Sequence, residues 1–238
     1  MKIVAVIPAR YSSTRFAGKV LAKDTGKFLI QHTYERACLA KLPQKVIIAA
    51  DDEKVVAAAR TFGAECVLTS PDHQSGTDRI AEAVRDMDVE IVVNLQADEP
   101  EIDPANIDHL ARLLVENPDY PMATLASAFT NAKQIADPNI VKVIVGRKSG
   151  AIYFSRSVIP YDREKAGVGD VRQYLRHIGI YAYRKKFLLE ITSLPQTPLE
   201  KIEKLEQLRA IENGFRILVG KVEHTTDGID TPEQYAEF

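Results

Sequence analysis

Residues 3–19 read Ile-Val-Ala-Val-Ile-Pro-Ala-Arg-Tyr-Ser-Ser-Thr-Arg-Phe-Ala-Gly-Lys, and this stretch decides the fold. Its first five residues are apolar and mostly β-branched, which predicts a strand buried on both faces. Pro8 is expected to end the strand, because proline cannot donate to a sheet ladder. The loop that follows carries basic side chains at Arg10, Arg15 and Lys19, four hydroxyls and Gly18. Ligands of open α/β sheets bind beyond the carboxyl ends of parallel strands, so this loop is a candidate binding site.

The crowding of positive charge in the loop favours a polyanionic ligand. Three basic side chains this close repel one another unless something negative lies between them, and a nucleoside triphosphate is the simplest such anion. A solvated basic loop without a ligand is the alternative. The loop matches neither the P-loop pattern nor the G-x-G-x-x-G pattern of dinucleotide-binding proteins, which disfavours a methyltransferase or dehydrogenase of Rossmann type. The sequence therefore indicates a nucleotide site of a third kind.

Length and composition describe an ordinary globular chain. The 238 residues suit one α/β domain with a modest insertion. A net charge of −2, from 31 basic and 33 acidic residues, gives no reason to expect nucleic acid or a membrane as partner. Apolar runs stay far below the ~20 residues that span a bilayer and no leader precedes the first strand, so we expect a cytoplasmic protein. Cys38 and Cys66 have no metal-ligand spacing and are expected to be buried free thiols.

Strand and helix signals alternate through the first half of the chain. Strands are expected at 46–50, 65–68 and 90–95, with helices at 28–41, from Asp51-Asp52 to Gly63, after the loop at 69–79 with Ile80, Val84 and Met87 on one face, and from Asp103-Pro104 to 117. This rhythm predicts βαβ units and a mostly parallel, Rossmann-like sheet.

The rhythm changes at residue 121. Strands at 122–129, 141–145 and 151–154 are joined by short connections, and a further strand follows at 176–183 after a Gly-rich link at 166–169. This pattern predicts an antiparallel sub-domain at 121–184 inserted into a single domain spanning 1–238. A long helix at 199–213, a strand at 216–222 and a short helix capped by Thr231 complete the expected order.

Two further polar stretches follow strands of the parallel sheet. The loop at 69–79 leads into a helix whose free amides, next to Arg79, suit a nucleotide or a phosphate, and simple capping by Ser75 or Thr77 is the alternative. Asp98 stands at the tip of the strand at 90–95, across from the basic loop, where a Mg²⁺ ion carrying phosphates would be held. Capping of the next turn is the alternative role for Asp98.

In the second half, His177 and Tyr181 are four residues apart in a strand and therefore share a face. Together with Arg156 they suit a sugar acid, with the guanidinium on the carboxylate and the other two groups on hydroxyls. An ordinary polar sheet face is the alternative.

Several strings resemble one family over residues 3–233. The sequence is similar to nucleotidyltransferases that activate sugars, most closely the cytidylyltransferases acting on 3-deoxy-manno-octulosonate (Kdo), an acidic eight-carbon sugar. The resemblance rests on Pro8-Ala9-Arg10, Ser13-Thr14-Arg15, Gly18-Lys19, Thr69–His73, Ser75–Arg79, Phe154–Arg156, Ile159-Pro160, Arg176–Tyr181, Pro198–Arg209 and Ile229–Glu233. Departures from the family pattern are Ala17, Val20, Ala97 and the stretch 223–228.

The resemblance implies a nucleotidyltransferase sheet and transfer of CMP from CTP to the anomeric hydroxyl of Kdo, with release of pyrophosphate, for lipopolysaccharide synthesis. It implies Mg²⁺ on Asp98 and Asp230, catalysis by these two carboxylates with Arg10 and Lys19, and a homodimer formed through the insertion. Transfer to the 8-amino analogue of Kdo, or a non-catalytic nucleotide-binding homologue, are the alternatives. The implied CTP-binding residues are Pro8, Ala9, Arg10, Arg15, Lys19, Thr69, Ser70, Gly76, Arg79 and Gln96, and the implied sugar-binding residues are Gln96, Arg156, His177, Tyr181, Glu206 and Gln207.

Overall fold

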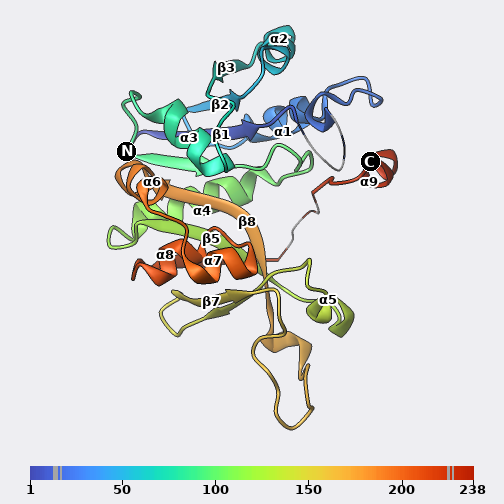
Figure 1. Cartoon of the computed structure of the whole chain (residues 1–238), viewed down its shortest axis with the longest axis vertical. Helices are drawn as coiled ribbons and strands as arrows, with labels where there is room; N and C mark the ends of the chain where they lie inside the picture. Colours follow the sequence, from blue (N-terminus) through green and yellow to red (C-terminus); the bar gives the residue numbers. More distant parts are fainter. Residues whose placement is uncertain (13–15, 17, 224–225, 227) are drawn as a thin grey trace.

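The protein is an α/β structure built on one nine-stranded sheet (Figure 1). The computed structural model describes residues 1–12, 16, 18–223, 226 and 228–238. The sheet path runs β3-β2-β1-β4-β8-β5-β9, and off this path β6 pairs with β8 and β7 pairs with β6. The strands are β1 (Ile3–Ala9), β2 (Lys45–Ala50), β3 (Glu65–Leu68), β4 (Ile91–Asn94), β5 (Met122–Ala128), β6 (Lys142–Val145), β7 (Ala151–Ser155), β8 (Leu175–Arg184) and β9 (Ile217–Val222).

Most of the path is parallel, as expected. β2 pairs parallel with both β1 and β3, β1 with β4, and β9 with β5, whereas β8 is antiparallel to both β4 and β5. Strands β5 and β8 of the region 121–184 thus lie in the central sheet itself, and only the hairpin β6–β7 lies off its path.

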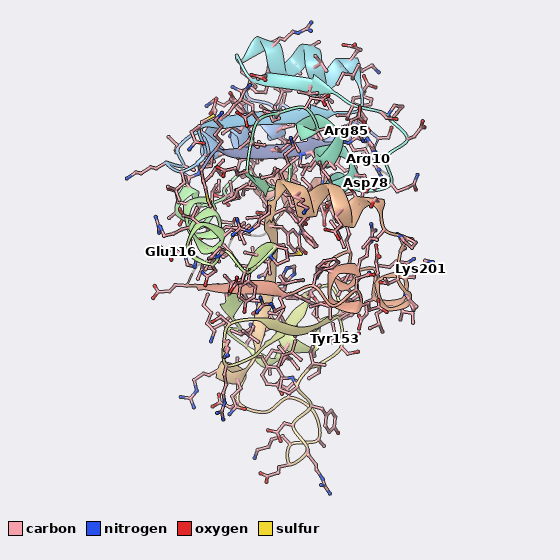
Figure 2. All side chains as sticks on the ribbon, turned by 90° about the vertical axis from the view of Figure 1, so that its left-hand side faces the viewer. Arg10, Asp78, Arg85, Glu116, Tyr153 and Lys201 are labelled. Atoms are coloured by element: carbon pink, nitrogen blue, oxygen red, sulfur yellow. The ribbon has the colours of Figure 1, made fainter. Side chains whose placement is uncertain are left out.

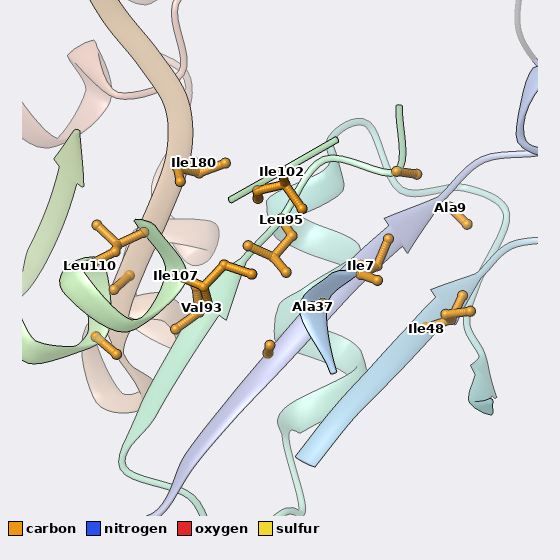
Figure 3. Close-up of a cluster of buried hydrophobic side chains, with 14 of the residues drawn as sticks. Ile7, Ala9, Ala37, Ile48, Val93, Leu95, Ile102, Ile107, Leu110 and Ile180 are labelled. Atoms are coloured by element: carbon orange, nitrogen blue, oxygen red, sulfur yellow. The ribbon is translucent and has the colours of Figure 1, made fainter. Parts of the chain in front are cut away.

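Helices cover both faces of the sheet. One hydrophobic core contains side chains of α1 (Leu29–Ala37), α2 (Glu53–Thr61) and α4 (Pro104–Glu116), and the other contains those of α3 (Gly76–Val84), α6 (Lys185–Ser193) and α8 (Leu208–Glu212). Alternate residues of β1 enter the two cores, which confirms a strand buried on both faces. Figure 3 shows the first core, where Val93 of β4 lies beside Ile107 of α4 and Ile7 follows on the neighbouring strand β1.

The remaining helices are short. They are α5 (Ala132–Ala136), α7 (Pro198–Glu203) and α9 (Pro232–Glu237), with single 3-10 turns at Lys19–Leu21 and Val171–Gln173. In the described part of the chain, no helix combines the length and the apolar character needed to cross a bilayer.

The structure corrects the expected end of β1. The strand passes through Pro8 and ends at Ala9, which pairs with Ala50 of β2. Val6 faces β4, since its carbonyl accepts from Leu95 N at 3.0 Å, and Pro8 faces the same side two residues later, where β4 has already ended at Asn94. The missing N–H of Pro8 therefore removes no hydrogen bond from the sheet.

Two further expectations were wrong. The helix expected at 199–213 is split into α7 and α8, because Lys204 adopts a left-handed conformation with φ 53°. The first helix ends at Ala37 rather than at residue 41. Cys38 therefore follows the helix and is exposed, and Cys66 is only half-buried, whereas both thiols were expected to be buried. Both cysteines are free, as expected.

Candidate active site

Lys19 joins the basic loop to both predicted metal carboxylates. Its ammonium donates to Asp98 Oδ2 at 2.7 Å, to Asp230 Oδ1 at 3.1 Å and to the carbonyl of Ile229 at 2.8 Å. The lysine side chain is 11% exposed, and the carboxylates of Asp98 and Asp230 are 27% and 41% exposed. Two residues more than 130 positions apart thus meet at the carboxyl end of β4, the arrangement that the family resemblance implies.

The C-terminal segment is fixed against this end of the sheet. Ile229 N donates to the carbonyl of Asp98 at 2.8 Å, and Thr231 caps α9 with Pro232 at its first position. The ring of Tyr235 packs against Phe16 at 5.8 Å, and its hydroxyl accepts from Asp24 N at 2.9 Å. Packing of α9 therefore sets the position of the Asp230 carboxylate.

Arg79 lies almost completely buried at the start of α3. Its Nη1 donates to Thr69 Oγ1 at 2.7 Å and to the carbonyl of Ser70 at 3.2 Å, which confirms that these three predicted residues lie together. Its Nη2 has no hydrogen-bond partner and lies 3.5 Å from a carboxylate oxygen of Asp51. Burial lowers the pKa of the Arg79 guanidinium, Asp51 opposes that shift, and the charge of Arg10 adds to it. This guanidinium thus carries one donor that remains available to a ligand.

Asp51 is a site residue that sequence reasoning placed only at a helix start. Asp52 caps α2 through Lys54 N, whereas the Asp51 carboxylate accepts from Tyr11 N at 2.8 Å and approaches Arg79. It therefore connects the basic loop to the loop at 69–79. The available signal in the sequence was the pair Asp51-Asp52. A helix needs only one carboxylate as its cap, so the other aspartate could have a different role.

The loop at 69–79 is also held by α3 and by Arg10. Glu82 accepts from Ser70 N at 3.1 Å and bonds the His73 ring, and Arg10 Nη2 donates to the His73 carbonyl at 2.5 Å. Figure 2 labels Arg10 and Asp78 in the upper half of the molecule, above Lys201 and Tyr153. Arg15 lies outside the described residues.

The start of α3 resolves the choice of cap. Ser75 forms a capping box with Asp78, so Ser75 is the cap and Thr77 is not. Gly76 stands where an added Cβ would lie 3.2 Å from Pro8 Cγ, closer than ordinary van der Waals contact. A glycine at this point lets the start of α3 approach the end of β1.

His177 and Tyr181 share one face of β8, and their rings lie 5.5 Å apart. Burial lowers the pKa of His177 to about 3, so its imidazole is neutral. Thr124 Oγ1 lies 2.8 Å from the Ile180 carbonyl and 3.0 Å from His177 Nε2. A hydroxyl has one proton, so donation to Ile180 leaves Oγ1 to accept from Nε2–H and leaves Nδ1 as an acceptor.

Glu206 and Gln207 line a small cavity together with Tyr181. Burial raises the pKa of the Glu206 carboxyl, while a hydrogen bond from Thr77 and the charge of Arg209 lower it. Gln207 Nε2 is buried without a hydrogen-bond partner, which leaves a donor for a ligand. Thr77 and Tyr183 also line it, and neither was predicted as a sugar-site residue, because each lies in an element whose face is decided by long-range packing.

The other two predicted sugar residues lie on different elements. Gln96 Nε2 donates to the Gly179 carbonyl at 3.0 Å, which places it beside the irregular part of β8. Arg156 follows β7, and its Nε and Nη1 donate to the carbonyls of Glu203 and Pro138 at 2.7 and 3.0 Å. Phe154, two residues earlier, packs edge-on against the His177 ring at 4.9 Å.

A mostly parallel sheet whose carboxyl edge combines a basic loop, two converging carboxylates and a buried arginine defines a nucleotidyltransferase-type site. The family described as cytidylyltransferase matches residues 4–217. A 3-deoxy-manno-octulosonate cytidylyltransferase of Solibacter usitatus is 51% identical over 98% of this chain and 91% of its own length. The enzyme of the same name from Geobacter sulfurreducens is 46% identical over 98% and 96%.

Solved structures agree with this classification. A CMP:2-keto-3-deoxy-manno-octonic acid synthetase complexed with CTP superposes with a TM-score of 0.93 and 43% identity, covering 100% of this chain and 96% of the other. A cytidylyltransferase of Leptospira borgpetersenii, 19% identical with a TM-score of 0.65 over 99% and 84% of the two chains, shares the fold. The chain belongs to the cytidylyltransferases and, within them, to the 3-deoxy-manno-octulosonate cytidylyltransferase family.

Proposed function

We propose that this enzyme transfers CMP from CTP to the anomeric hydroxyl of Kdo, giving CMP-Kdo and pyrophosphate, which is the reaction that the names of its relatives describe. The observation that supports this best is the meeting of Lys19, Asp98 and Asp230 at the carboxyl edge of the sheet. In this reaction the sugar oxygen attacks the α-phosphorus, and pyrophosphate leaves with its bonding electrons. The site must therefore stabilise negative charge on phosphate oxygens, which basic side chains and a divalent cation can do.

On the nucleotide side, the basic loop holds the triphosphate. Arg10, Arg15 and Lys19 neutralise charge that develops on the leaving pyrophosphate. Arg79, with Thr69 and Ser70, borders the nucleotide and presents the unpaired Nη2, while Gly76 lets the ligand and the start of α3 approach Pro8 and Ala9. These groups bind and orient CTP. The reaction requires no side-chain nucleophile, because the sugar oxygen itself attacks the α-phosphorus.

On the sugar side, neutral hydrogen-bonding groups orient the hydroxyls. His177 accepts through Nδ1, Tyr181 and Gln207 donate, and Glu206 accepts. Gln96 lies between the end of β4 and β8, where it can contact both substrates. Arg156 supplies positive charge for the sugar carboxylate in this proposal.

The residues present fit a Mg²⁺ ion held by Asp98 and Asp230. Both carboxylates already converge on one cationic group, and in the described part of the chain no third Asp, Glu, His or Cys joins them. One or two carboxylates with water and substrate oxygens is the usual protein environment of this ion. When bound, Mg²⁺ supplies positive charge to the phosphates and makes the attacking hydroxyl more acidic.

We also propose a cytoplasmic homodimer. β7 pairs only with β6 among the described residues, and its Ile152 is 58% exposed, so the face of the hairpin is suited to a second copy of the chain. CTP, the nucleotide substrate, is a cytoplasmic metabolite. Light scattering of the purified protein and of Ile152→Glu tests the dimer, and an Ile152→Glu protein with unchanged mass would contradict this interface.

Pyrophosphate release tests the function. Purified protein receives CTP and Mg²⁺ with Kdo, its 8-amino analogue, N-acetylneuraminate or no sugar, and each reaction is repeated with EDTA. Release only with Kdo and only with metal supports the proposal. Release with the 8-amino sugar alone would assign a different substrate, and bound CTP without any release would indicate a non-catalytic homologue.

A further inference from the structure

The two sugar-site residues Glu206 and Gln207 lie in a break between helices, where the sequence pattern predicts continuous helix. α7 ends at Glu203, Lys204 takes φ 53° and ψ 47°, and α8 begins at Leu208. A left-handed backbone conformation is less favourable for lysine than for glycine, so other contacts must hold the chain in this conformation. These contacts are hydrogen bonds between the end of β7 and Glu203, and an ion pair that joins α7 to α8.

Glu203 is held by the end of β7 through three hydrogen bonds. Its carboxylate accepts from Ser155 Oγ at 2.6 Å and from Arg156 N at 3.0 Å, and its carbonyl accepts from Arg156 Nε at 2.7 Å. Ser155 is buried, and the Arg156 carbonyl accepts from the buried ammonium of Lys142 at 2.5 Å. The end of α7 is therefore attached to a buried, hydrogen-bonded part of the hairpin β6–β7.

The other side of the break is held by a buried ion pair. Arg209 donates from Nε and Nη2 to both carboxylate oxygens of Glu200, at 2.9 and 2.6 Å, and both side chains are about 5% exposed. Arg209 Nη1 also lies 3.3 Å from the Ile191 carbonyl at the end of α6. The four residues between Glu203 and Leu208 thus span two fixed ends.

We propose that Glu203 is a positioning residue for sugar recognition: through Ser155 and Arg156 it holds the left-handed turn at Lys204 that directs Glu206 and Gln207 toward Tyr181. This inference rests on the proposed function, because that function assigns these three residues to the sugar. It predicts that loss of the Glu203 carboxylate weakens the use of Kdo selectively. The groups that border CTP lie on β1, α3 and the loop at 69–79, and none of them contacts Glu203 through the hydrogen bonds described above.

A matched pair of variants tests the carboxylate. Glu203→Ala removes acceptors at the end of α7 next to the site, and Glu212→Ala removes the carboxylate that accepts from Leu199 N at 3.0 Å at the opposite end of the same helix. We expect Glu203→Ala to raise the KM for Kdo about tenfold or more, since displacement of binding groups by ~1 Å has effects of this size, with the KM for CTP within about twofold. Glu212→Ala should change neither KM, and Glu203→Gln, which keeps one acceptor oxygen, should lie between Glu203→Ala and the parent.

A second pair tests the turn itself. Lys204→Gly and Lys204→Val both remove the lysine side chain, but glycine accepts a positive φ and a β-branched residue resists it. We expect Lys204→Gly to keep the parent KM for Kdo and Lys204→Val to raise it, again without an effect on CTP. Both proteins remain informative if Glu203→Ala fails to fold.

The outcomes separate this inference from the function on which it rests. Absence of Kdo-dependent pyrophosphate release in the parent protein would overturn the proposed function. If the parent releases pyrophosphate with Kdo, either of two results would overturn the positioning role alone. One is that Glu203→Ala and Glu212→Ala have the same KM values for both substrates. The other is that Lys204→Val and Lys204→Gly have the same KM for Kdo.

Discussion

Replacement of Asp98 by asparagine should affect turnover far more than it affects the stability of the fold. Asparagine keeps the size of the side chain, and the hydrogen bond from Ile229 N to the backbone carbonyl of residue 98 is untouched. The lost interaction is a charge-assisted bond to Lys19 at 2.7 Å, with side chains that are 11% and 27% exposed. Such a bond contributes ~1.5–3 kcal/mol when buried. Solvent screening reduces this, so we expect Asp98→Asn to lower the free energy of unfolding by about 1 kcal/mol.

The effect on turnover should be much larger. The variant lacks one of two carboxylates that would hold Mg²⁺ and keeps Lys19 without its closest counter-charge, so we expect kcat to fall at least ~100-fold, equivalent to about 2.7 kcal/mol. Pyrophosphate release over a range of Mg²⁺ concentrations, beside urea unfolding, measures both quantities. Asp103→Asn is the control, because Asp103 only caps α4 and asparagine also caps well. Turnover of Asp98→Asn within threefold of the parent at saturating Mg²⁺ would refute the role of Asp98.

Three more outcomes are expected. The pKa of His177 is lowered to about 3 by burial, so the unfolded chain binds a proton that the folded protein does not. The free energy of unfolding should therefore fall as the pH drops below 6.5, by about 1.4 kcal/mol from this group at pH 5.5, and His177→Gln should lack that part of the pH dependence. Arg79→Lys keeps the charge but loses the fork that bonds Thr69 and Ser70, and should raise the KM for CTP about tenfold with the KM for Kdo unchanged; equal changes in both would contradict its place beside the nucleotide. Arg209→Met leaves the buried Glu200 carboxylate uncompensated and should lower the free energy of unfolding by ~3–5 kcal/mol, measured in urea, whereas a loss below 1 kcal/mol would show that the pair is solvated.

Much of the fold and part of the site follow from local patterns. Apolar runs of strand length, alternating with helical periods and closed by capping residues, predicted the order of β1 to α4 with errors of a few residues, because burial on both faces of a parallel sheet leaves a strong local signal. The carboxyl ends of parallel strands meet at one edge, so the sequence could also bring Lys19 and Asp98 together.

Other features depended on contacts between distant segments. The helical period continues through Lys204, yet the chain turns there because Ser155 and Arg156 hold Glu203 from a strand almost 50 residues away. Asp51, Thr77 and Thr124 look like ordinary polar residues in the sequence, and only packing shows which of them reach the site.

The sequence by itself determined the class of fold, the family and the edge of the sheet where the site lies, because these depend on periodicity and on motifs that are contiguous in the chain. Only the tertiary structure decided the positions of Asp230, Glu206 and Gln207 relative to the strands. The physical reason is that their directions are set by hydrogen bonds and packing between elements, whose energies depend on which distant groups meet and leave no periodic signal in the sequence.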